Sequence, residues 1–405
     1  MSSDSFINEE FLQRLLGCKI KSYTCNVGTK PGDNYLSTIY SVKVVLCDDS
    51  LKSILVKCYP ENVAKREFLD NTSIFSTEYL IYDQFLPALN QLVDTCGDDK
   101  STFAVNVASF YGGNIIGIKS TRFDAEPWIS ENFIVLEDLR TKGYKMLDRR
   151  KGLDLDHVLL TIKQLANLHA LSWVYKRRNG LHLLVNKYPY LKDVMYKKEN
   201  EAGWKPVLEG LNRNALEIIQ QEFGPESDIF LKLKALLSKD VMDMIRIYLN
   251  GTGIDELVAE SLLRIKPDGP IPFADDQWLV ATHGDSWINN LLFAYNEEKT
   301  PKSVVIVDHQ TFRETCLTVD LAYLIYSSTP VSLRKQSVPV LLRTYFDHFV
   351  EICQKLNEKP PVSFTFSNFE RRWRRARIYG LLMSINFITF IHKPDEPEHT
   401  QKQLK

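Results

Sequence analysis

The sequence predicts an α+β protein of two lobes: a small lobe of antiparallel strands with one key helix, and a larger, mainly helical lobe. Early in the chain, apolar residues alternate over Thr38–Leu46 and again over Lys52–Tyr59, which is typical of half-buried strands. After Thr141 this alternation nearly vanishes and helical spacing replaces it. We therefore predict one lobe over residues 1–139 and a second over residues 140–405.

The small lobe is expected to contain two helical segments besides its strands. Residues 1–16 are predicted to form a short helix with its apolar residues on one side. A second helix is predicted over Thr72–Leu86, with a polar N-cap at residues 71–73 and with Pro87 closing it. The last strand of the lobe is expected to end in Asn132–Leu139.

The larger lobe is predicted to be helical with one exception. Helices are expected over residues 155–178, 190–200, 206–222, 228–249, 255–263, 334–356 and 367–391. The exception is a hairpin, in which Leu291–Tyr295 and Ser303–Val307 are joined by a polar turn.

Composition excludes several classes of protein. Lys and Arg number 50 against 51 Asp and Glu, so no overall field attracts nucleic acid or a membrane surface. The seven cysteines are scattered and form no CxxC pair, which indicates free thiols in a reducing compartment. The acidic first residues are unlike a signal peptide, and the apolar stretch Gly380–Ile391 is too short to span a bilayer. We expect a cytoplasmic protein without a membrane span or a nucleic-acid partner; oligomeric state is not indicated.

The strongest functional signal lies in Thr282–Asn290, where His283, Asp285 and Asn290 form the pattern H-x-D-x₄-N. This is the spacing of a kinase catalytic loop. A loop of this length can direct Asp285 at an acceptor hydroxyl and turn Asn290 back to hold Mg²⁺ beside the transferred phosphate. We therefore predict Asp285 as the catalytic residue and Asn290 as a metal ligand. His283 is expected to fix the loop by hydrogen bonding.

Two further carboxylates follow this loop. Asp308 ends the apolar strand of the predicted hairpin, and the hairpin would bring it back beside Asn290 so that both bind Mg²⁺. Asp320 precedes an apolar run, so helix capping is its simplest role. We expect Asp320 to brace the catalytic loop rather than to take part in the chemistry.

A lysine and a glutamate of the small lobe are predicted to form a pair. Lys57 lies within an apolar strand, where a lysine is costly unless it snorkels or finds an anion. Glu78 lies within an apolar helical stripe with Ile74 and Ile81. In kinases such a pair directs the lysine at the α- and β-phosphates of ATP. The alternative is a surface ion pair of little value, which the apolar surroundings disfavour.

Taken together, these residues make the chain resemble the ecdysteroid kinase-like family, a branch of the aminoglycoside phosphotransferase and choline kinase group with a protein-kinase-like fold. The resemblance covers roughly residues 8–390. It rests on Gly32–Ser37, Lys57, Phe75–Glu78, Val135–Leu139, Leu165–Ala170, His283–Asn290 and Asp308–Gln310. The HGDxWxxN block and the VLEDL segment are specific to this family.

The resemblance implies Mg²⁺-dependent transfer of phosphate from ATP to a hydroxyl of a small molecule, with ecdysteroids as the namesake substrate. It implies Asp285 as the catalytic aspartate and Asn290 and Asp308 as metal ligands. The residues expected at the nucleotide are Gly32, Asn34, Ser37, Lys57, Glu78, Glu137 and Leu139, with Leu136–Leu139 as the hinge whose backbone bonds the adenine edge. One departure is His309, because the position after Asp308 is usually aromatic; a histidine can pack there, titrate or contact phosphate.

Other classes of protein fit less well. A metallophosphoesterase needs more His and Asp ligands than this chain offers, and His169 is expected to be a buried, hydrogen-bonded histidine. A catalytically silent pseudokinase that binds nucleotide or a small ligand is the remaining alternative. The five arginines of Arg371–Arg377 are expected to form a mostly solvated helix surface. Aromatic residues in the helical lobe give a slight hint of a bulky apolar acceptor, although they would equally make a core.

Overall fold

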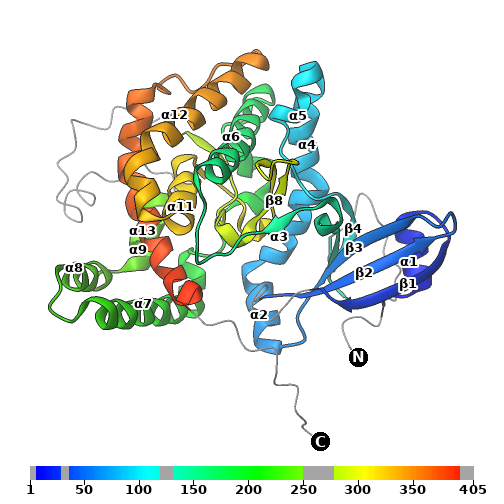
Figure 1. The fold of residues 1–405 in the computed structure, drawn as a ribbon, viewed down its shortest axis with the longest axis horizontal. Coiled ribbons are helices and arrows are strands. Elements are labelled where there is room, and N and C mark those ends of the chain that lie inside the picture. Colours follow the sequence, from blue (N-terminus) through cyan, green and yellow to red (C-terminus); the bar gives the residue numbers. More distant parts are fainter. Residues whose placement is uncertain (1–5, 29–35, 119–130, 250–277, 393–405) are drawn as a thin grey trace, which may run out of the picture. The chain divides into compact units, whose positions relative to one another are not determined.

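The computed structural model describes residues 6–28, 36–118, 131–249 and 278–392 (Figure 1). These residues divide into two compact units. The first consists of the described parts of Met1–Leu69, Ser109–Asp138 and Ile388–Lys405, and the second of those of Asp70–Ala108 and Leu139–Phe387. The first unit is built on an antiparallel sheet and the second is mainly helical, which confirms the predicted α+β class.

A five-stranded antiparallel sheet forms the centre of the first unit, in the order β1-β2-β3-β5-β4. Its strands are β1 Ile20–Val27, β2 Thr38–Leu46, β3 Leu51–Cys58, β4 Phe110–Asn114 and β5 Phe133–Glu137. Lys57 of the middle strand β3 lies opposite Ile39 of β2 and Ile134 of β5. The strands predicted over 38–46 and 52–59 are confirmed to within one residue.

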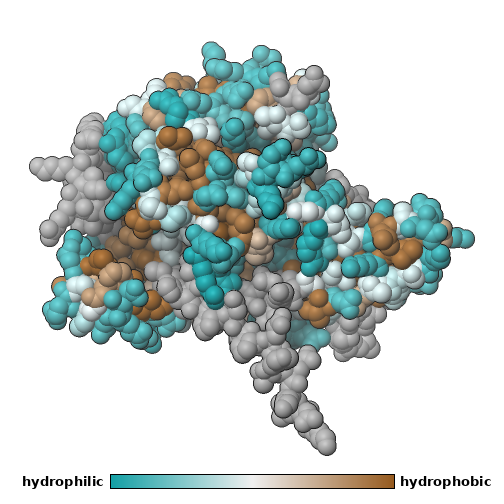
Figure 2. Space-filling view, viewed as in Figure 1, coloured by the Kyte–Doolittle hydropathy of each residue, from teal (hydrophilic) through white to brown (hydrophobic). Residues whose placement is uncertain are grey.

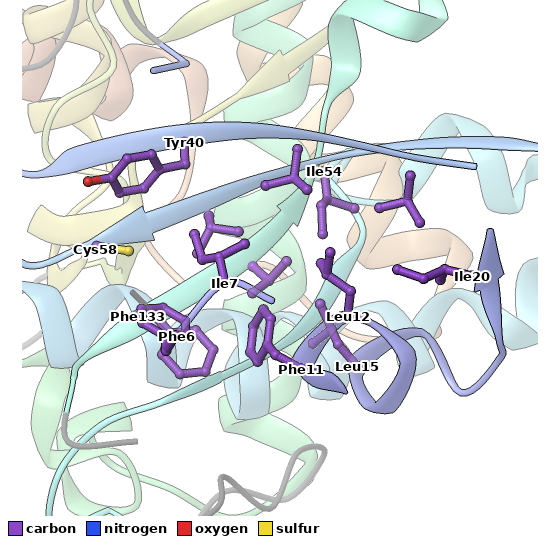
Figure 3. Close-up of a cluster of buried hydrophobic side chains, with 14 of the residues drawn as sticks. Phe6, Ile7, Phe11, Leu12, Leu15, Ile20, Tyr40, Ile54, Cys58 and Phe133 are labelled. Atoms are coloured by element: carbon purple, nitrogen blue, oxygen red, sulfur yellow. The ribbon is translucent and has the colours of Figure 1, made fainter. Parts of the chain in front are cut away.

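Helix α1, Glu9–Leu16, covers one face of this sheet and closes its core (Figure 3). It begins at Asn8, whose Oδ1 accepts a hydrogen bond from the N–H of Phe11 at 2.9 Å, and it ends at Gly17, whose φ of 65° favours glycine. The rings of Phe6 and Phe11 both contact Phe133, at centroid distances of 4.8 and 5.4 Å. The helix is shorter than the predicted 1–16, of which residues 1–5 lie outside the described part.

The helix predicted over Thr72–Leu86 is longer and less regular than expected. After α2 Val63–Thr72, the chain forms α3 Ile74–Leu80, a π-helical turn over Ile81–Phe85, α4 Leu86–Asn90, a 3₁₀ segment over Gln91–Asp99, and α5 Lys100–Phe103. Ser73 separates α2 from α3 in a left-handed conformation and makes no side-chain cap, so the predicted N-cap is wrong. Pro87 sits in the first turn of α4, where its missing N–H leaves no bond unmade, so the predicted stop at Pro87 is also wrong.

The second unit is dominated by long helices. They are α6 Leu155–Arg178, α7 Glu201–Phe223, α8 Asp228–Leu237, α9 Val241–Leu249, α11 Thr318–Ser328, α12 Val331–Lys355 and α13 Phe366–His392. Short 3₁₀ turns join them over Leu139–Lys142, Leu184–Asn186, Pro189–Leu191, Lys198–Asn200, Ile288–Asn290 and His309–Thr311. Helices α6 and α12 pack along each other.

Two helices differ from the sequence prediction. The single helix predicted over 228–249 is two helices, because Asp240 Oδ1 accepts from the N–H of Asp243 at 3.0 Å and so caps a new one. The stretch 190–200 forms 3₁₀ turns instead of a helix; there Asp193 bonds the N–H of Tyr196 and turns the chain. The helix predicted over 255–263 lies outside the described residues.

Two small sheets lie within the helical unit. The predicted hairpin is confirmed as β8 Leu291–Tyr295 and β9 Pro301–Ile306, with β6 Lys145–Met146 added at its edge. A second antiparallel pair, β7 Leu279–Thr282 and β10 Arg313–Cys316, was not predicted. Because β7 leads into residues 283–290 and β10 begins shortly after Asp308, the two sheets frame the predicted site.

Aromatic residues of α12, of α13 and of the segment before α13 pack against one another in the second unit. Tyr345 stacks on Phe369 at a centroid distance of 5.4 Å, and Phe346 stacks on Phe364 at 4.9 Å. This cluster therefore gives no support to the slight hint of an apolar acceptor pocket. Apolar side chains do gather on the surface of α7 and α8 (Figure 2), where the exposed ones are Val207, Phe223, Ile229 and Leu231.

The arginine-rich part of α13 is only partly solvated. Arg374 is exposed, whereas the other four arginines are half-buried and Trp373 between them is buried. The guanidinium group of Arg372 lies 4.0 Å from the ring centroid of Trp278. The expected solvated surface is therefore wrong for Arg372, which packs on an aromatic ring. Among the described residues, none of the helices combines the length and apolarity that crossing a bilayer needs.

Candidate active site

Asp285 lies in the loop between β7 and β8, and both of its carboxylate oxygens accept hydrogen bonds. The amide nitrogen of Asn290 donates to Oδ2 at 2.9 Å and also to the backbone oxygen of Asp285 at 2.9 Å. The hydroxyl of Tyr323 donates to Oδ1. The five-residue segment therefore folds back on itself, so that Asn290 contacts Asp285.

The environment of Asp285 shifts its acidity. Burial raises its pKa to about 7, the hydrogen bond from Tyr323 acts in the opposite direction, and the neighbouring Asp308 charge adds to the rise. A proton acceptor works best with a pKa near the pH at which it operates. The pKa of Asp285 therefore suits the acceptance of a hydroxyl proton near neutral pH.

The hairpin brings Asp308 back to the loop. Leu291 of β8 pairs with Ile306 of β9, and the next N–H along, that of Val307, donates to the backbone oxygen of Asn290 at 2.9 Å. Asp308 follows immediately, in a left-handed conformation with φ 66°. Asp and Asn tolerate this conformation better than most residues, and such backbone strain is commonly found at functional sites.

The oxygen atoms in this corner are of the kind that Mg²⁺ prefers. Since the amide nitrogen of Asn290 faces Asp285, its Oδ1 is turned to the other side. The charge of Asp308 is close enough to raise the pKa of Asp285, so a second carboxylate lies nearby. Mg²⁺ prefers such oxygens and usually completes its shell with water and substrate phosphate. In the described part of the chain, no three His, Cys, Asp or Glu side chains form a metal-binding group. An ion here would thus depend on the phosphates as well as on Asn290 and Asp308.

Asp320 holds the start of the loop. Its carboxylate accepts from the N–H groups of His283 and Gly284 at 2.6 and 2.8 Å, and it is fully buried. His169 Nε2 lies 3.1 Å from Asp320 Oδ2, and the other nitrogen of His169 bonds the hydroxyl of Tyr345 at 2.7 Å. His169 is thus buried and hydrogen-bonded, as predicted. These contacts are the ones expected of a residue that supports the loop, and they differ from those of a simple helix cap.

Gly284 is required by the path of this loop. Its φ is 80°, and a Cβ atom there would lie 2.4 Å from the backbone oxygen of Thr311. No side chain fits this space, because the obstacle is backbone. The glycine of the H-G-D segment therefore lets the loop pass close to the chain after Asp308.

Replacing Asp320 with alanine is expected to destabilise the protein by about 3–5 kcal/mol, since it leaves two buried N–H groups and His169 without their shared acceptor. Chemical unfolding monitored by circular dichroism measures this free energy. Asp347→Ala is the matched control, because Asp347 is exposed and only approaches Arg343 at 3.6 Å. Equal free energies of unfolding for the two variants would contradict the brace.

The same prediction has a pH dependence. Burial works to raise the pKa of Asp320, but the hydrogen bond and charge of His169 and the contacts with His283 and Gly284 outweigh it and hold the pKa below its ordinary value. This stabilisation is present above the unfolded-state pKa of about 3.9 and is lost as pH falls through the lower folded-state pKa. The gap between wild type and Asp320→Ala should therefore be constant near neutral pH and narrow in acid.

An aromatic group surrounds the two histidines of the site. His309 is buried, and its ring lies 4.7 Å from that of Tyr82, 5.3 Å from His283 and 4.9 Å from Phe312. It packs among aromatic rings, which is one of the roles expected for a histidine at this position. Burial lowers the pKa of His283 to about 4, so this ring is neutral at physiological pH, and its Nδ1 accepts from the N–H of Asp285 at 3.3 Å.

Glu78 is placed in the same unit as the loop. It is fully buried on α3, which packs against the 3₁₀ turn after Asp308. Burial raises the pKa of Tyr82 well above its ordinary value, and the charges of Glu78 and Asp308 both add to the rise. Both carboxylates therefore lie close to Tyr82, and the structure brings Glu78 near the predicted metal site.

The other predicted nucleotide residues are distributed over the two units. Lys57 is buried in β3 of the first unit, where Glu137 ends β5 and accepts from the Ser109 hydroxyl at 3.0 Å. Leu139 is buried at the start of the second segment of the second unit, and Ser37 is half-buried just before β2. Gly32 and Asn34 lie outside the described residues. The roles of these residues stay predictions.

Sequence reasoning missed two side chains of the site. Tyr323 contacts Asp285 directly, and Arg313 of β10 is buried with its Nη2 3.4 Å from the Gly284 oxygen and 2.9 Å from the Tyr379 hydroxyl. Asp193 lies 3.5 Å from Arg313 Nη1 and balances the buried cation. A signal for Tyr323 did exist: it lies three residues after Asp320, and so on the same helix face.

Comparison with known proteins indicates the family to which the chain belongs. A sequence model of the ecdysteroid kinase-like family matches residues 31–358, which is most of the chain. Comparison with curated proteins gives no match. Among solved structures, the chain resembles a protein assigned as a fructosamine-3-kinase from Thermobifida fusca YX-ER1, at 12% identity and a TM-score of 0.37 over 96% of each chain.

Proposed function

Because the chain belongs to the ecdysteroid kinase-like family, we propose that it is an ATP- and Mg²⁺-dependent kinase that phosphorylates a hydroxyl of a small molecule. The observation that carries the proposal is the meeting of Asp285, Asn290 and the end of β9 at one corner. Ecdysteroids and similar lipophilic alcohols are the acceptors we propose. We assign nucleotide binding to residues 1–139, and the catalytic loop, metal site and acceptor pocket to residues 140–405.

The proposed reaction is a direct transfer. The acceptor oxygen forms a bond to the γ-phosphorus of ATP as the bond to the β–γ bridging oxygen breaks, which releases ADP. The hydroxyl proton passes to Asp285. Each carboxylate oxygen has two lone pairs, and one on each is used by Tyr323 or Asn290, so a lone pair is left for the acceptor hydroxyl.

Asn290 and Asp308 are the residues that would hold the metal. When bound, Mg²⁺ supplies positive charge that neutralises the phosphate oxygens during transfer. The hydrogen bond from Asn290 to Asp285 then links metal ligand and base through one side chain. His283 and Asp320 support the loop that carries both.

Lys57→Met is expected to lower kcat/KM for ATP by about tenfold to a hundredfold, because it removes a cation assigned to the phosphates. If Glu78 orients that lysine, Glu78→Gln should have a similar effect, and the double variant should lose little more than either single one. Steady-state kinetics with varied ATP measures all three. Additive losses would contradict the pairing of Lys57 with Glu78.

The function itself is tested by transfer of labelled γ-phosphate from ATP to a panel of steroid and other lipophilic alcohols, led by ecdysteroids. Label on an alcohol, dependent on Mg²⁺ and on the protein, supports the proposal. Binding of Mg-ATP without label on any alcohol favours the alternative of a catalytically silent pseudokinase. Absence of nucleotide binding would contradict both.

A cytoplasmic location is also proposed. All seven cysteines are described, and each is a free thiol. Free thiols are typical of a reducing compartment, in which ATP and Mg²⁺ are also abundant.

A further inference from the structure

Helix α11 contacts the catalytic loop at three positions, Asp320, Tyr323 and Ser328. Asp320 and Tyr323 are three residues apart and therefore lie on the same face of the helix. Asp320 binds the backbone at His283 and Gly284, as described above. At the other end of the loop, the hydroxyl of Ser328 accepts from the N–H of Ile288 at 3.0 Å. The loop is therefore attached to α11 on both sides of Asp285.

Tyr323 lies between Asp320 and Ser328 along α11 and contacts the side chain of Asp285 instead of the backbone. It is fully buried, and its hydroxyl donates to Oδ1. Burial, together with the negative charge of Asp285, raises the pKa of Tyr323 well above its ordinary value, so the phenol stays protonated and keeps its proton to donate. Because Asn290 donates to Oδ2, the two oxygens are held by donors from two different elements.

These two hydrogen-bond donors restrict the rotation of the Asp285 carboxylate. The terminal torsion of an aspartate is broad, so a carboxylate with one partner can turn about the Cβ–Cγ bond. With Oδ1 on Tyr323 and Oδ2 on Asn290, the plane of the group is fixed. Asn290, however, is also assigned to the metal, whereas neither Tyr323 nor its helix α11 is assigned to the metal or the nucleotide. Of the two donors to Asp285, the Tyr323 hydroxyl is therefore the one whose position does not depend on the metal.

On the basis of the function proposed above, we propose that Tyr323 is a positioning residue, whose hydroxyl fixes the carboxylate of Asp285 so that one oxygen faces the acceptor alcohol. Tyr323 neither binds substrate nor accepts the proton. Its contribution belongs to the transition state, because a freely turning carboxylate loses the productive geometry more often than it loses substrate.

The test is Tyr323→Phe, which removes one oxygen atom and keeps the ring. The variant is expected to lower kcat about tenfold, while KM for ATP and for the alcohol changes less than about twofold. Tyr175→Phe is the matched control. Tyr175 is also buried, and its hydroxyl lies 2.8 Å from that of Tyr188, which is not part of the loop. This control should keep the kcat of the wild type.

A second replacement separates position from packing. Incorporation of 3-fluorotyrosine at position 323 keeps the phenol as a donor and is expected to hold kcat within about twofold of the wild type. Rescue by this residue together with loss in Tyr323→Phe supports the proposal. An unchanged kcat in Tyr323→Phe overturns the proposal. An equal decrease of kcat in Tyr323→Phe and Tyr175→Phe also overturns it.

Failure of this inference is distinguishable from failure of the proposed function. If Asp285→Asn abolishes transfer while Tyr323→Phe keeps the kcat of the wild type, only the role of Tyr323 is wrong. If Asp285→Asn leaves transfer intact, the function assigned to the loop is wrong, and the role of Tyr323 falls with it.

Discussion

Asp285→Asn is expected to lower kcat by about a thousandfold, because the amide cannot take the proton of the acceptor hydroxyl. Binding of Mg-ATP should be nearly unchanged, since the side chains assigned to the metal are those of Asn290 and Asp308. Steady-state transfer of labelled phosphate gives kcat, and calorimetric titration with Mg-ATP gives the nucleotide affinity. Wild-type kcat in this variant would remove Asp285 from the chemistry.

The asparagine variant is expected to fold normally. Asn290 can still donate to the amide oxygen at position 285, and the Tyr323 hydroxyl can rotate to accept from the new amide nitrogen. Thermal unfolding should therefore give a Tm close to that of the wild type. Asp347→Asn, at an exposed carboxylate on α12, is the control for a change of one charge, and its kcat should equal that of the wild type.

Asp308→Asn is expected to lower turnover by about a thousandfold at moderate Mg²⁺ and to shift the Mg²⁺ concentration for half-maximal rate upward. The physical reason is that the variant keeps an oxygen ligand but loses the negative charge that attracts the ion. Measuring initial rate against Mg²⁺ concentration separates this effect from a loss of nucleotide affinity. An unchanged Mg²⁺ dependence would contradict the metal assignment.

Asparagine is preferable to alanine at position 308 because of the backbone. With φ at 66°, asparagine is tolerated nearly as well as aspartate, whereas alanine adds strain of about 1 kcal/mol or more. A fall in Tm for Asp308→Ala that is absent in Asp308→Asn would confirm this reason. The activity lost in the asparagine variant then reports on charge alone.

Much of the site could be predicted from sequence because it is local. The distance from Asp285 to Asn290 along the chain is five residues, and a loop that short has few ways to close. The hairpin of β8 and β9 could be predicted from its apolar alternation and its polar turn. Because β9 runs back along β8, it ends beside Asn290, just before Asp308. In both cases the contact was determined by residues adjacent in sequence.

The parts that could not be predicted depend on contacts distant in sequence. Tyr323 contacts Asp285 across 38 residues, and its position three residues after Asp320 indicates the helix face but not the contact itself. Strands β7 and β10 have four residues each, too few for alternation to show. The sequence could not distinguish the two possible roles of Asp320. Capping of a helix and support of a separate loop both require an aspartate at this position.

The helix predicted over Thr72–Leu86 shows how a local rule can mislead. Proline usually stops a helix, but it is equally suited to the first turn of a new one. The π-helical turn over Ile81–Phe85 shifts the register just before Pro87, so that α4 starts there. The same turn places Tyr82 against His309, a contact that a regular helix pattern does not reveal.

The central claim is direct transfer of phosphate to an alcohol with Asp285 as the base. Its most direct test is to quantify ADP and phosphorylated alcohol in the same samples, for the intact protein and for Asp285→Asn. The account predicts equal amounts of the two products with the intact protein, and about a thousandfold less of both with the variant while Mg-ATP still binds. ADP formed without phosphorylated alcohol, or ester formed equally well by the variant, would contradict it.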